Sequence, residues 1–181
     1  MSRKLTVLFD GTWNTTKDRT NVVRLSELIA IAGSDDGEQL PPYYDKGVGT
    51  HVLDRVIGGT FGYGLSDNIR DGYRWLAGNF RPGDELFLFG FSRGAYTARS
   101  LGGLTTRFGL LDEAGLDEKT LWSRVQELFR DGYRVKGAKR KAWLDKGWKF
   151  KAGEGGTPDI PVHFIGVWDT VGALGIPDHL G

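Results

Sequence analysis

Apolar residues gather in short runs along this chain, and between the runs they recur at the three- and four-residue spacing of a helix. Continuous apolar runs predict strands at residues 5–9, 85–91 and 162–168. A shorter strand is predicted around Tyr43-Tyr44. The helical spacing predicts helices at residues 21–31, 66–80, 93–105 and 121–135. Strands that are apolar throughout are typical of a parallel sheet buried on both faces. The pattern therefore predicts an α/β fold, a doubly wound and mostly parallel sheet with helices on both sides.

The composition is that of an ordinary globular protein. The chain has 181 residues, of which 39% are hydrophobic and 26% are charged. This length suits one domain, so we expect residues 1–181 to form a single unit. The formal net charge of +1 supplies no overall field to attract nucleic acid or an anionic membrane. Because the sequence has no cysteine, it contains neither a disulfide framework nor a thiolate metal site.

Two segments bear on location and partners. The amino terminus, MSRKLTVLFDGTWN, has too short an apolar stretch before Asp10 for a signal peptide or a membrane span. We expect cytoplasmic synthesis, no integral membrane segment and no nucleic-acid partner, while export without a cleaved signal would leave no trace. The basic stretch at residues 136–151 is interpreted as a solvated surface segment, with a lid or a docking surface for anionic groups as the alternative.

The most informative motif joins the run at residues 85–91 to the helix after it. Gly90-Phe91-Ser92-Arg93-Gly94 has the form Gly-x-Ser-x-Gly, which places a nucleophilic serine on a sharp strand-to-helix turn. Glycines at 90 and 94 leave the room that such a turn needs, and the helix directs its N–H groups and positive dipole end at the serine. Ser92 is the predicted nucleophile, and the Arg93 amide is a predicted oxyanion donor. The alternative is a chance pattern in a chain with 28 glycines.

A serine nucleophile needs a base to take its proton and an acid to orient that base. Asp169 is the candidate acid because it ends the run at residues 162–168 and follows Ser92 in the chain. The alternative is an aspartate that caps a helix or shapes a loop. Only one histidine, His179, follows Asp169, and the intervening residues leave no room for the usual helix and strand. His179 is therefore a weak candidate, and the base is expected beyond residue 181.

The run at residues 5–9 ends in Asp10-Gly11-Thr12. In hydrolases with a serine elbow, the second oxyanion N–H comes from a loop after an early strand, so Gly11 or Thr12 is predicted to supply it. A turn-forming role is the alternative for Asp10. A phosphotransfer role is disfavoured because Thr12 stands where a second acid would be needed to bind magnesium. Catalysis by a serine, a histidine and an aspartate needs neither a metal nor a cofactor, so none is expected.

Five blocks of the sequence resemble, in order, the catalytic domain of the type VI secretion phospholipase effectors, which belong to the wider α/β-hydrolase family. The blocks are LFDGTWN (8–14), YYDKGVGT (43–50), GGTFGYGLSDNIRDGYRWL (58–76), GDELFLFGFSRGAYTARSLGGL (83–104) and FIGVWDTVGALGIP (164–177). The resemblance implies an α/β-hydrolase fold, Ser92 as nucleophile and Asp169 as acid. It also implies a histidine in a downstream segment that this sequence lacks, so the chain is either a fragment of a longer domain or a domain that has lost part of the sheet and the base. A secretion or immunity partner is implied as well.

The sequence therefore predicts a serine hydrolase that cleaves carboxylic esters through an acyl-enzyme. The expected substrate is a phospholipid acyl ester or, alternatively, a small ester. A hydrolase for other esters or thioesters is one alternative. The second alternative is a truncated or inactive hydrolase domain that acts as a binding or assembly module.

Overall fold

A four-stranded sheet forms the centre of the molecule. The computed structural model describes residues 3–11, 16–33, 40–47, 63–144, 146–151 and 160–170. The strands lie in the order β2-β1-β3-β4, and each neighbouring pair is parallel. Their bounds are β1 (Lys4–Phe9), β2 (Tyr43–Asp45), β3 (Glu85–Phe91) and β4 (Val162–Trp168). The predicted strands and their parallel pairing are confirmed.

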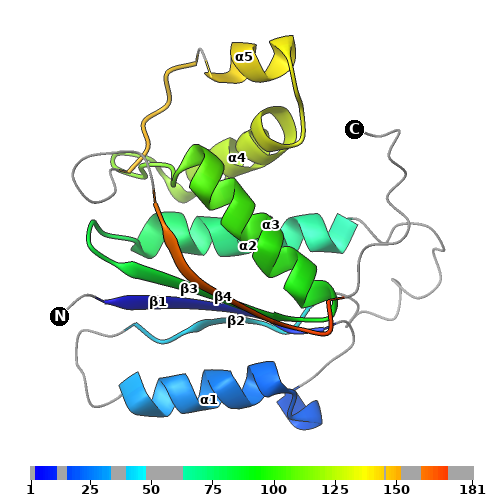
Figure 1. The fold of residues 1–181 in the computed structure, drawn as a ribbon. Coiled ribbons are helices and arrows are strands. Elements are labelled where there is room, and N and C mark those ends of the chain that lie inside the picture. The colour runs from blue at the N-terminus through cyan, green and yellow to red at the C-terminus, as the bar shows by residue number, and fades with distance from the viewer. Residues whose placement is uncertain are drawn as a thin grey trace.

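Helices lie on both faces of this sheet (Figure 1). The 3-10 turn η1 (Thr16–Asp18) leads into α1 (Asn21–Gly33) on one face. On the other face lie α2 (Tyr63–Asn79) and α3 (Arg93–Phe108), with α4 (Glu118–Glu127) and α5 (Ala138–Leu144) in a further layer beyond them. Because β2 and β3 pair with opposite edges of β1, the chain reverses its direction across the sheet at β1. This is the doubly wound arrangement that the sequence predicts, and ligands bind at such a reversal beyond the carboxyl ends of the strands.

The two outer helices only partly match the predicted pattern. The expected helix at residues 121–135 begins earlier, at α4, because Asp117 caps it by accepting a hydrogen bond from the Thr120 amide at 2.7 Å. It then widens into a π-helical turn, η3 (Leu128–Tyr133). The helix α5 lies inside the basic stretch at residues 136–151, where no helix was predicted. None of the described helices is both long and apolar enough to cross a membrane.

Burial across the sheet is uneven. In β1 every residue from Leu5 to Phe9 is buried, as a strand covered on both faces should be. In β3 burial alternates, because Leu86 and Leu88 face the core under α2 and α3 while the residues between them are only half-buried. The edge strand β4 is largely open, with Phe164 51% exposed. The expectation of burial on both faces is therefore correct for β1 and wrong for β4.

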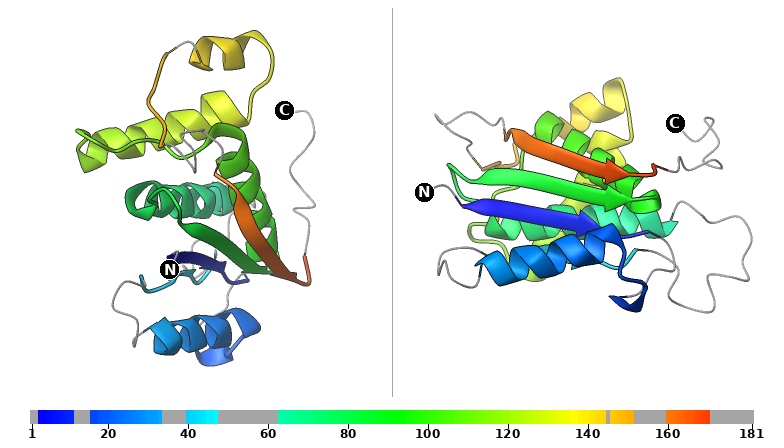
Figure 2. Two further views of the ribbon diagram at one scale, coloured as in Figure 1. Left: turned by 60° about the vertical axis from the view of Figure 1, so that its left-hand side comes forward. Right: turned by 60° about the horizontal axis from the view of Figure 1, so that its bottom comes forward.

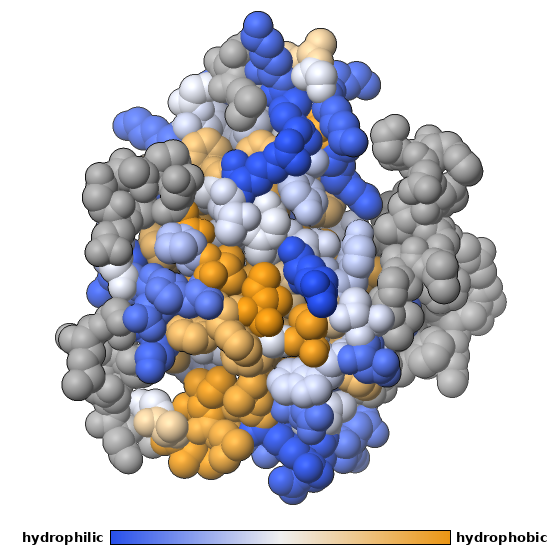
Figure 3. All heavy atoms as spheres, in the orientation of Figure 1, coloured by the Kyte–Doolittle hydropathy of each residue, from blue (hydrophilic) through white to orange (hydrophobic). Residues whose placement is uncertain are grey.

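The open face has a simple cause. Helix α1 packs against β1 and β3 but leaves β4 beyond its reach (Figure 2). No other described α-helix lies on that side, and no described strand pairs with the outer edge of β4. Apolar side chains consequently gather on the surface over β4 and α1 (Figure 3). The most exposed of them, besides Phe164, are Leu28, Ile31 and Ile165.

One buried phenol ties α2 to the end of α3. Tyr73 is fully buried, its hydroxyl donates to the carbonyl oxygen of Gly109 at 2.8 Å, and it accepts from the amide of Leu111 at 3.0 Å. Burial raises the pKa of this phenol, so the hydroxyl keeps its proton and remains a donor. The side chain thus satisfies two backbone groups, a carbonyl and an amide, in the segment that follows α3.

We predict that Tyr73→Phe destabilises the protein by about 2 kcal/mol, because it leaves a buried N–H and a buried carbonyl without partners. Urea denaturation measures the change. Tyr133→Phe is the matched control, since Tyr133 is only half-buried, and it should change the free energy of unfolding by less than about 0.5 kcal/mol. Equal effects of the two substitutions would contradict the role assigned to Tyr73.

Candidate active site

The turn between β3 and α3 holds Ser92 in a strained backbone conformation. Its φ is 55° and its ψ is −120°, a region that residues with a side chain rarely adopt. Such a conformation costs roughly 1–3 kcal/mol and persists only where the surrounding structure enforces it. The strain falls on the one serine that the sequence motif singles out. An outlier of this kind supports a functional hypothesis for Ser92.

Close backbone contacts explain both glycines of the motif. A Cβ atom at Gly90 would lie 2.3 Å from the carbonyl oxygen of Gly94, within the same turn. A Cβ atom at Gly94 would lie 2.3 Å from the carbonyl oxygen of Phe9 and 2.5 Å from that of Asp10. Neither position can carry a side chain unless the backbone moves. The first contact closes the turn, and the second seats α3 on the end of β1.

The structure brings Asp169 to the same edge of the sheet as Ser92. The amide of Ser92 donates to the carbonyl oxygen of Trp168 at 3.0 Å, which ties the turn to the last residue of β4. Asp169 follows directly, is exposed and has a φ of 45°. The strands β3 and β4 thus deliver the predicted nucleophile and acid to adjacent positions at their carboxyl ends. The catalytic role of each residue stays a prediction.

The carboxylate of Asp10 is buried and accepts hydrogen bonds from three of the described residues. Only 1% of the residue is exposed. Its Oδ2 accepts from the hydroxyl of Thr20 at 2.6 Å and from that of Tyr44 at 3.0 Å, while its Oδ1 accepts from the amide of Gly11 at 2.7 Å. Asp10 therefore does more than shape a turn, because it joins β1 to β2 and to the segment that leads into α1.

The bond from Gly11 bears on the predicted oxyanion site. The amide N–H of Gly11 points at the carboxylate of Asp10, so it would have to turn away to reach an oxyanion. Thr12, the alternative donor, lies outside the described residues. The amide of Arg93 is in the first turn of α3, where the helix directs its N–H groups and its positive dipole end toward Ser92.

Sequence reasoning missed the second half of this polar cluster. Burial, followed by the hydrogen bond to Asp10, raises the pKa of the Tyr44 phenol, so Tyr44 remains a donor to that carboxylate. Asp45 accepts from the amide of Gly47 at 2.7 Å and from Nδ2 of Asn68 at 2.9 Å, and burial raises the pKa of its carboxyl. The sequence did contain a signal for Asp45, because this aspartate lies at the end of a predicted strand, as Asp10 does.

The structure brings no described histidine to Ser92. His163 lies near the start of β4, where its ring stacks on Phe87 with centroids 6.1 Å apart. Six residues of strand, or about 20 Å, separate it from Asp169. His51 and His179 lie outside the described residues. Among the described residues, no three His, Asp or Glu side chains lie close enough together to hold a metal ion.

A groove of about 640 Å³ lies elsewhere, between α2 and α4. Its lining mixes acidic and basic groups, and Arg74 pairs with Glu118 across it at 2.7 Å. None of the predicted site residues lines it. The candidate active site is therefore the carboxyl edge of the sheet, where the motif residues meet.

We predict that Ser92→Gly stabilises the protein by about 1 kcal/mol, because glycine adopts a positive φ without strain. Thermal and urea denaturation measure the change. Ser100→Gly is the control, because it makes the same substitution inside α3 and should destabilise by about 0.5–1 kcal/mol. Loss of stability in both variants would show that Ser92 is not strained.

We predict that Gly94→Ala destabilises the protein by about 3 kcal/mol, since the added methyl group would meet the backbone of β1. The control is Gly103→Ala in the same helix, where the nearest atom is the Tyr133 hydroxyl at 3.3 Å. Urea denaturation compares the two variants. A Gly94→Ala protein as stable as Gly103→Ala would mean that α3 does not seat on β1 as described.

Comparisons with known proteins confirm the resemblance of the five sequence blocks. The family described as "T6SS, Phospholipase effector Tle1-like, catalytic domain" matches residues 3–181. The chain is also 30% identical over 193 residues to the uncharacterized protein YEL023C of Saccharomyces cerevisiae. That match covers 96% of this chain and 27% of the yeast protein, so the chain spans about a quarter of that relative's length. No solved structure matches it. The chain belongs to the family of Tle1-like phospholipase effector catalytic domains.

Proposed function

We propose that this chain carries the nucleophile and the acid of a serine hydrolase that cleaves the acyl esters of phospholipids. The observation that carries the proposal is the backbone of Ser92, which is held at φ 55° between two glycines at the carboxyl edge of the sheet. The family description supports a phospholipid as the substrate class. Asp169, directly after the adjacent strand β4, supports a carboxylate-oriented base beside the serine.

In the first half of the reaction, the Oγ atom of Ser92 attacks the carbonyl carbon of the ester, and its proton passes to a histidine that Asp169 orients. The carbonyl π electrons move to the oxygen, which becomes an oxyanion. The amide of Arg93 and the positive end of the α3 dipole stabilise that charge. Gly11 supplies a second N–H if its amide turns from the Asp10 carboxylate to the oxyanion.

In the second half, the intermediate collapses and the bond to the leaving alcohol breaks. The alcohol takes the proton from the histidine, and the acyl group remains on Ser92. Water then attacks the acyl-enzyme, gives its proton to the same histidine and releases the fatty acid while Ser92 regains its proton. The route needs a histidine that the described residues do not place, and His179, which follows Asp169 in the chain, is the candidate within this sequence.

We predict that a fluorophosphonate probe labels Ser92. The reason is that a serine on such a turn, beside a helix N-terminus, is more nucleophilic than a surface hydroxyl. Mass spectrometry of the labelled peptide identifies the site. Ser92→Ala should abolish labelling, whereas Ser100→Ala, a change in the same helix, should leave it intact. A folded protein that does not react would contradict the proposal.

Hydrolysis of a short-chain chromogenic ester by the same variants then locates the base. Turnover that is lost in both Ser92→Ala and His179→Ala identifies His179. Turnover that is lost only in Ser92→Ala places the base elsewhere. Labelling at Ser92 without turnover above background would show that the nucleophile is formed but that its base is missing from this chain.

A further inference from the structure

Positive charge is concentrated in one segment of this chain. Residues 134–151 contain eight Lys or Arg residues and one Asp, whereas the whole chain has 24 basic and 23 acidic residues. The segment therefore carries a net charge of plus seven, and the remainder carries minus six. Surface charges farther apart than about 8 Å are largely screened at physiological ionic strength. The local charge of residues 134–151, rather than the net charge of +1, then decides which partners this segment attracts.

The segment is held in a fixed place by its own aromatic and arginine side chains. Trp143 on α5 is only 4% exposed, and its ring meets those of Trp148 and Phe108 at centroid distances of 5.2 Å and 5.7 Å. Arg140, also on α5, donates from Nε to the carbonyl oxygen of Gly132 at 2.9 Å. A helix this short would not be stable alone, so these contacts are what hold it.

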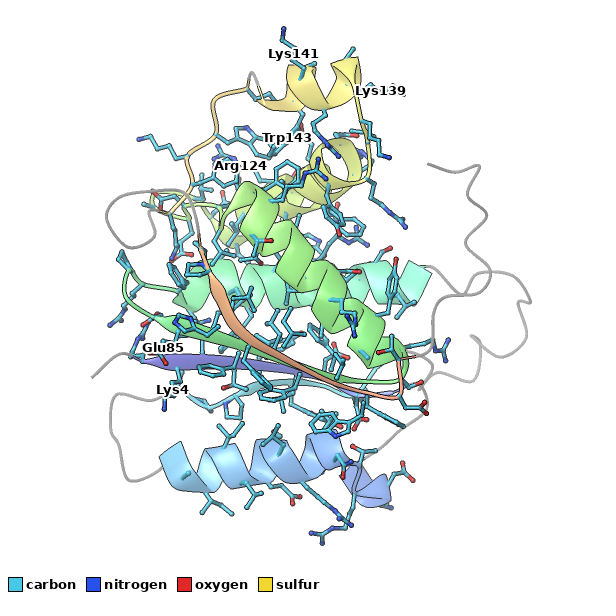
Figure 4. The ribbon with its side chains drawn as sticks, in the orientation of Figure 1. Lys4, Glu85, Arg124, Lys139, Lys141 and Trp143 are labelled. Atoms are coloured by element: carbon cyan, nitrogen blue, oxygen red, sulfur yellow. The ribbon has the colours of Figure 1, made fainter. Side chains whose placement is uncertain are left out.

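Anchoring one side of α5 turns its lysines outward. Lys139 and Lys141 extend away from the molecule, whereas Trp143 points inward (Figure 4). Lys136, just before the helix, is exposed as well. We call Lys136, Lys139 and Lys141 the basic surface.

The described acidic groups at the end of α4 and in η3, the elements that precede α5, already have partners. Asp131 pairs with Arg130 at 2.6 Å, and Glu127 pairs with Lys146. Within the described part of the chain, no ion pair engages the three lysines of the basic surface. Their charge is therefore available to an outside partner.

We propose that the basic surface binds the anionic surface of a phospholipid bilayer and holds the domain there. Lysines on a convex helix suit mobile lipid headgroups, and each adds about five-fold to the partition onto an anionic membrane. A nucleic acid fits less well, because Trp143, the aromatic residue of α5, is buried and offers no face for a base to stack on. The choice of lipid as the partner rests on the proposed function, because the proposed substrate, a phospholipid, is a component of the bilayer.

The basic surface is remote from the candidate active site. Ser92 precedes the first residue of α3, whereas α5 packs near the last, where Phe108 meets Trp143. The 16 residues of α3 span about 24 Å. The basic surface therefore acts on attachment to the membrane and not on the chemistry at Ser92.

The test is co-sedimentation with vesicles, made in the Ser92→Ala background so that no lipid is consumed. Vesicles contain either phosphatidylcholine alone or phosphatidylcholine mixed with phosphatidylglycerol. We predict binding to the mixed vesicles alone, and an approximately hundred-fold loss of partition in the triple variant Lys136→Gln/Lys139→Gln/Lys141→Gln. Lys17→Gln/Lys46→Gln/Lys119→Gln is the control, because it removes the same charge from three exposed lysines elsewhere.

Several outcomes would overturn the proposal. They are absence of binding to the mixed vesicles, equal losses in the two triple variants, and tighter binding of a single-stranded oligonucleotide than of the vesicles. Circular dichroism verifies that each variant is folded. Because binding is measured without the Ser92 hydroxyl, it does not depend on whether the chain is a hydrolase. Turnover of a soluble short-chain ester, measured with Ser92 intact, should be the same in both triple variants.

Discussion

The first turn of α3 rests directly on the backbone at the end of β1, and the geometry of the candidate site depends on that contact. Gly94 can approach the carbonyl oxygens of Phe9 and Asp10 only because it has no side chain. The contact sets the position of Ser92 relative to the Asp10-Gly11 turn, while the bond from the Ser92 amide to Trp168 sets its position relative to Asp169. Three strands thus place the site through backbone contacts, which leave little freedom for the side chains above them.

The polar cluster around Asp10 completes this arrangement. A buried carboxylate is costly unless several donors satisfy it. The donors to Asp10 come from the strand β2, from the residue just before α1 and from its own turn. Each of these segments is therefore held to the carboxyl edge of the sheet. Asp10 thus joins these segments beside the turn that holds Ser92, although the residue itself is not assigned a part in the chemistry.

Much of this fold was predictable from the sequence, because its strands are continuous apolar runs. The serine turn was predictable as well, because it requires two residues without side chains and the sequence has glycine at both positions. Asp10 was recognisable as a strand-end aspartate, but its partners Thr20 and Tyr44 are distant in sequence and carry no shared motif. Helix α5 was not predictable, because its stability comes from the packing of Trp143 and not from helical spacing. The exposure of one face of β4 was not predictable either, since an apolar run does not show which face of the strand is covered by a helix.

The open side of β4 has a consequence for what can pair with this sheet. The strand has no charged residue and no proline between Val162 and Trp168, and its outer edge carries backbone groups that no described strand engages. Native sheets usually protect such edges with lysine, proline or a bulge. The irregularity that the described part of the strand shows is a shift in pairing near its start, on the inner side that faces β3. Within the described part of the chain, β4 therefore offers an edge at which a further strand would extend the sheet.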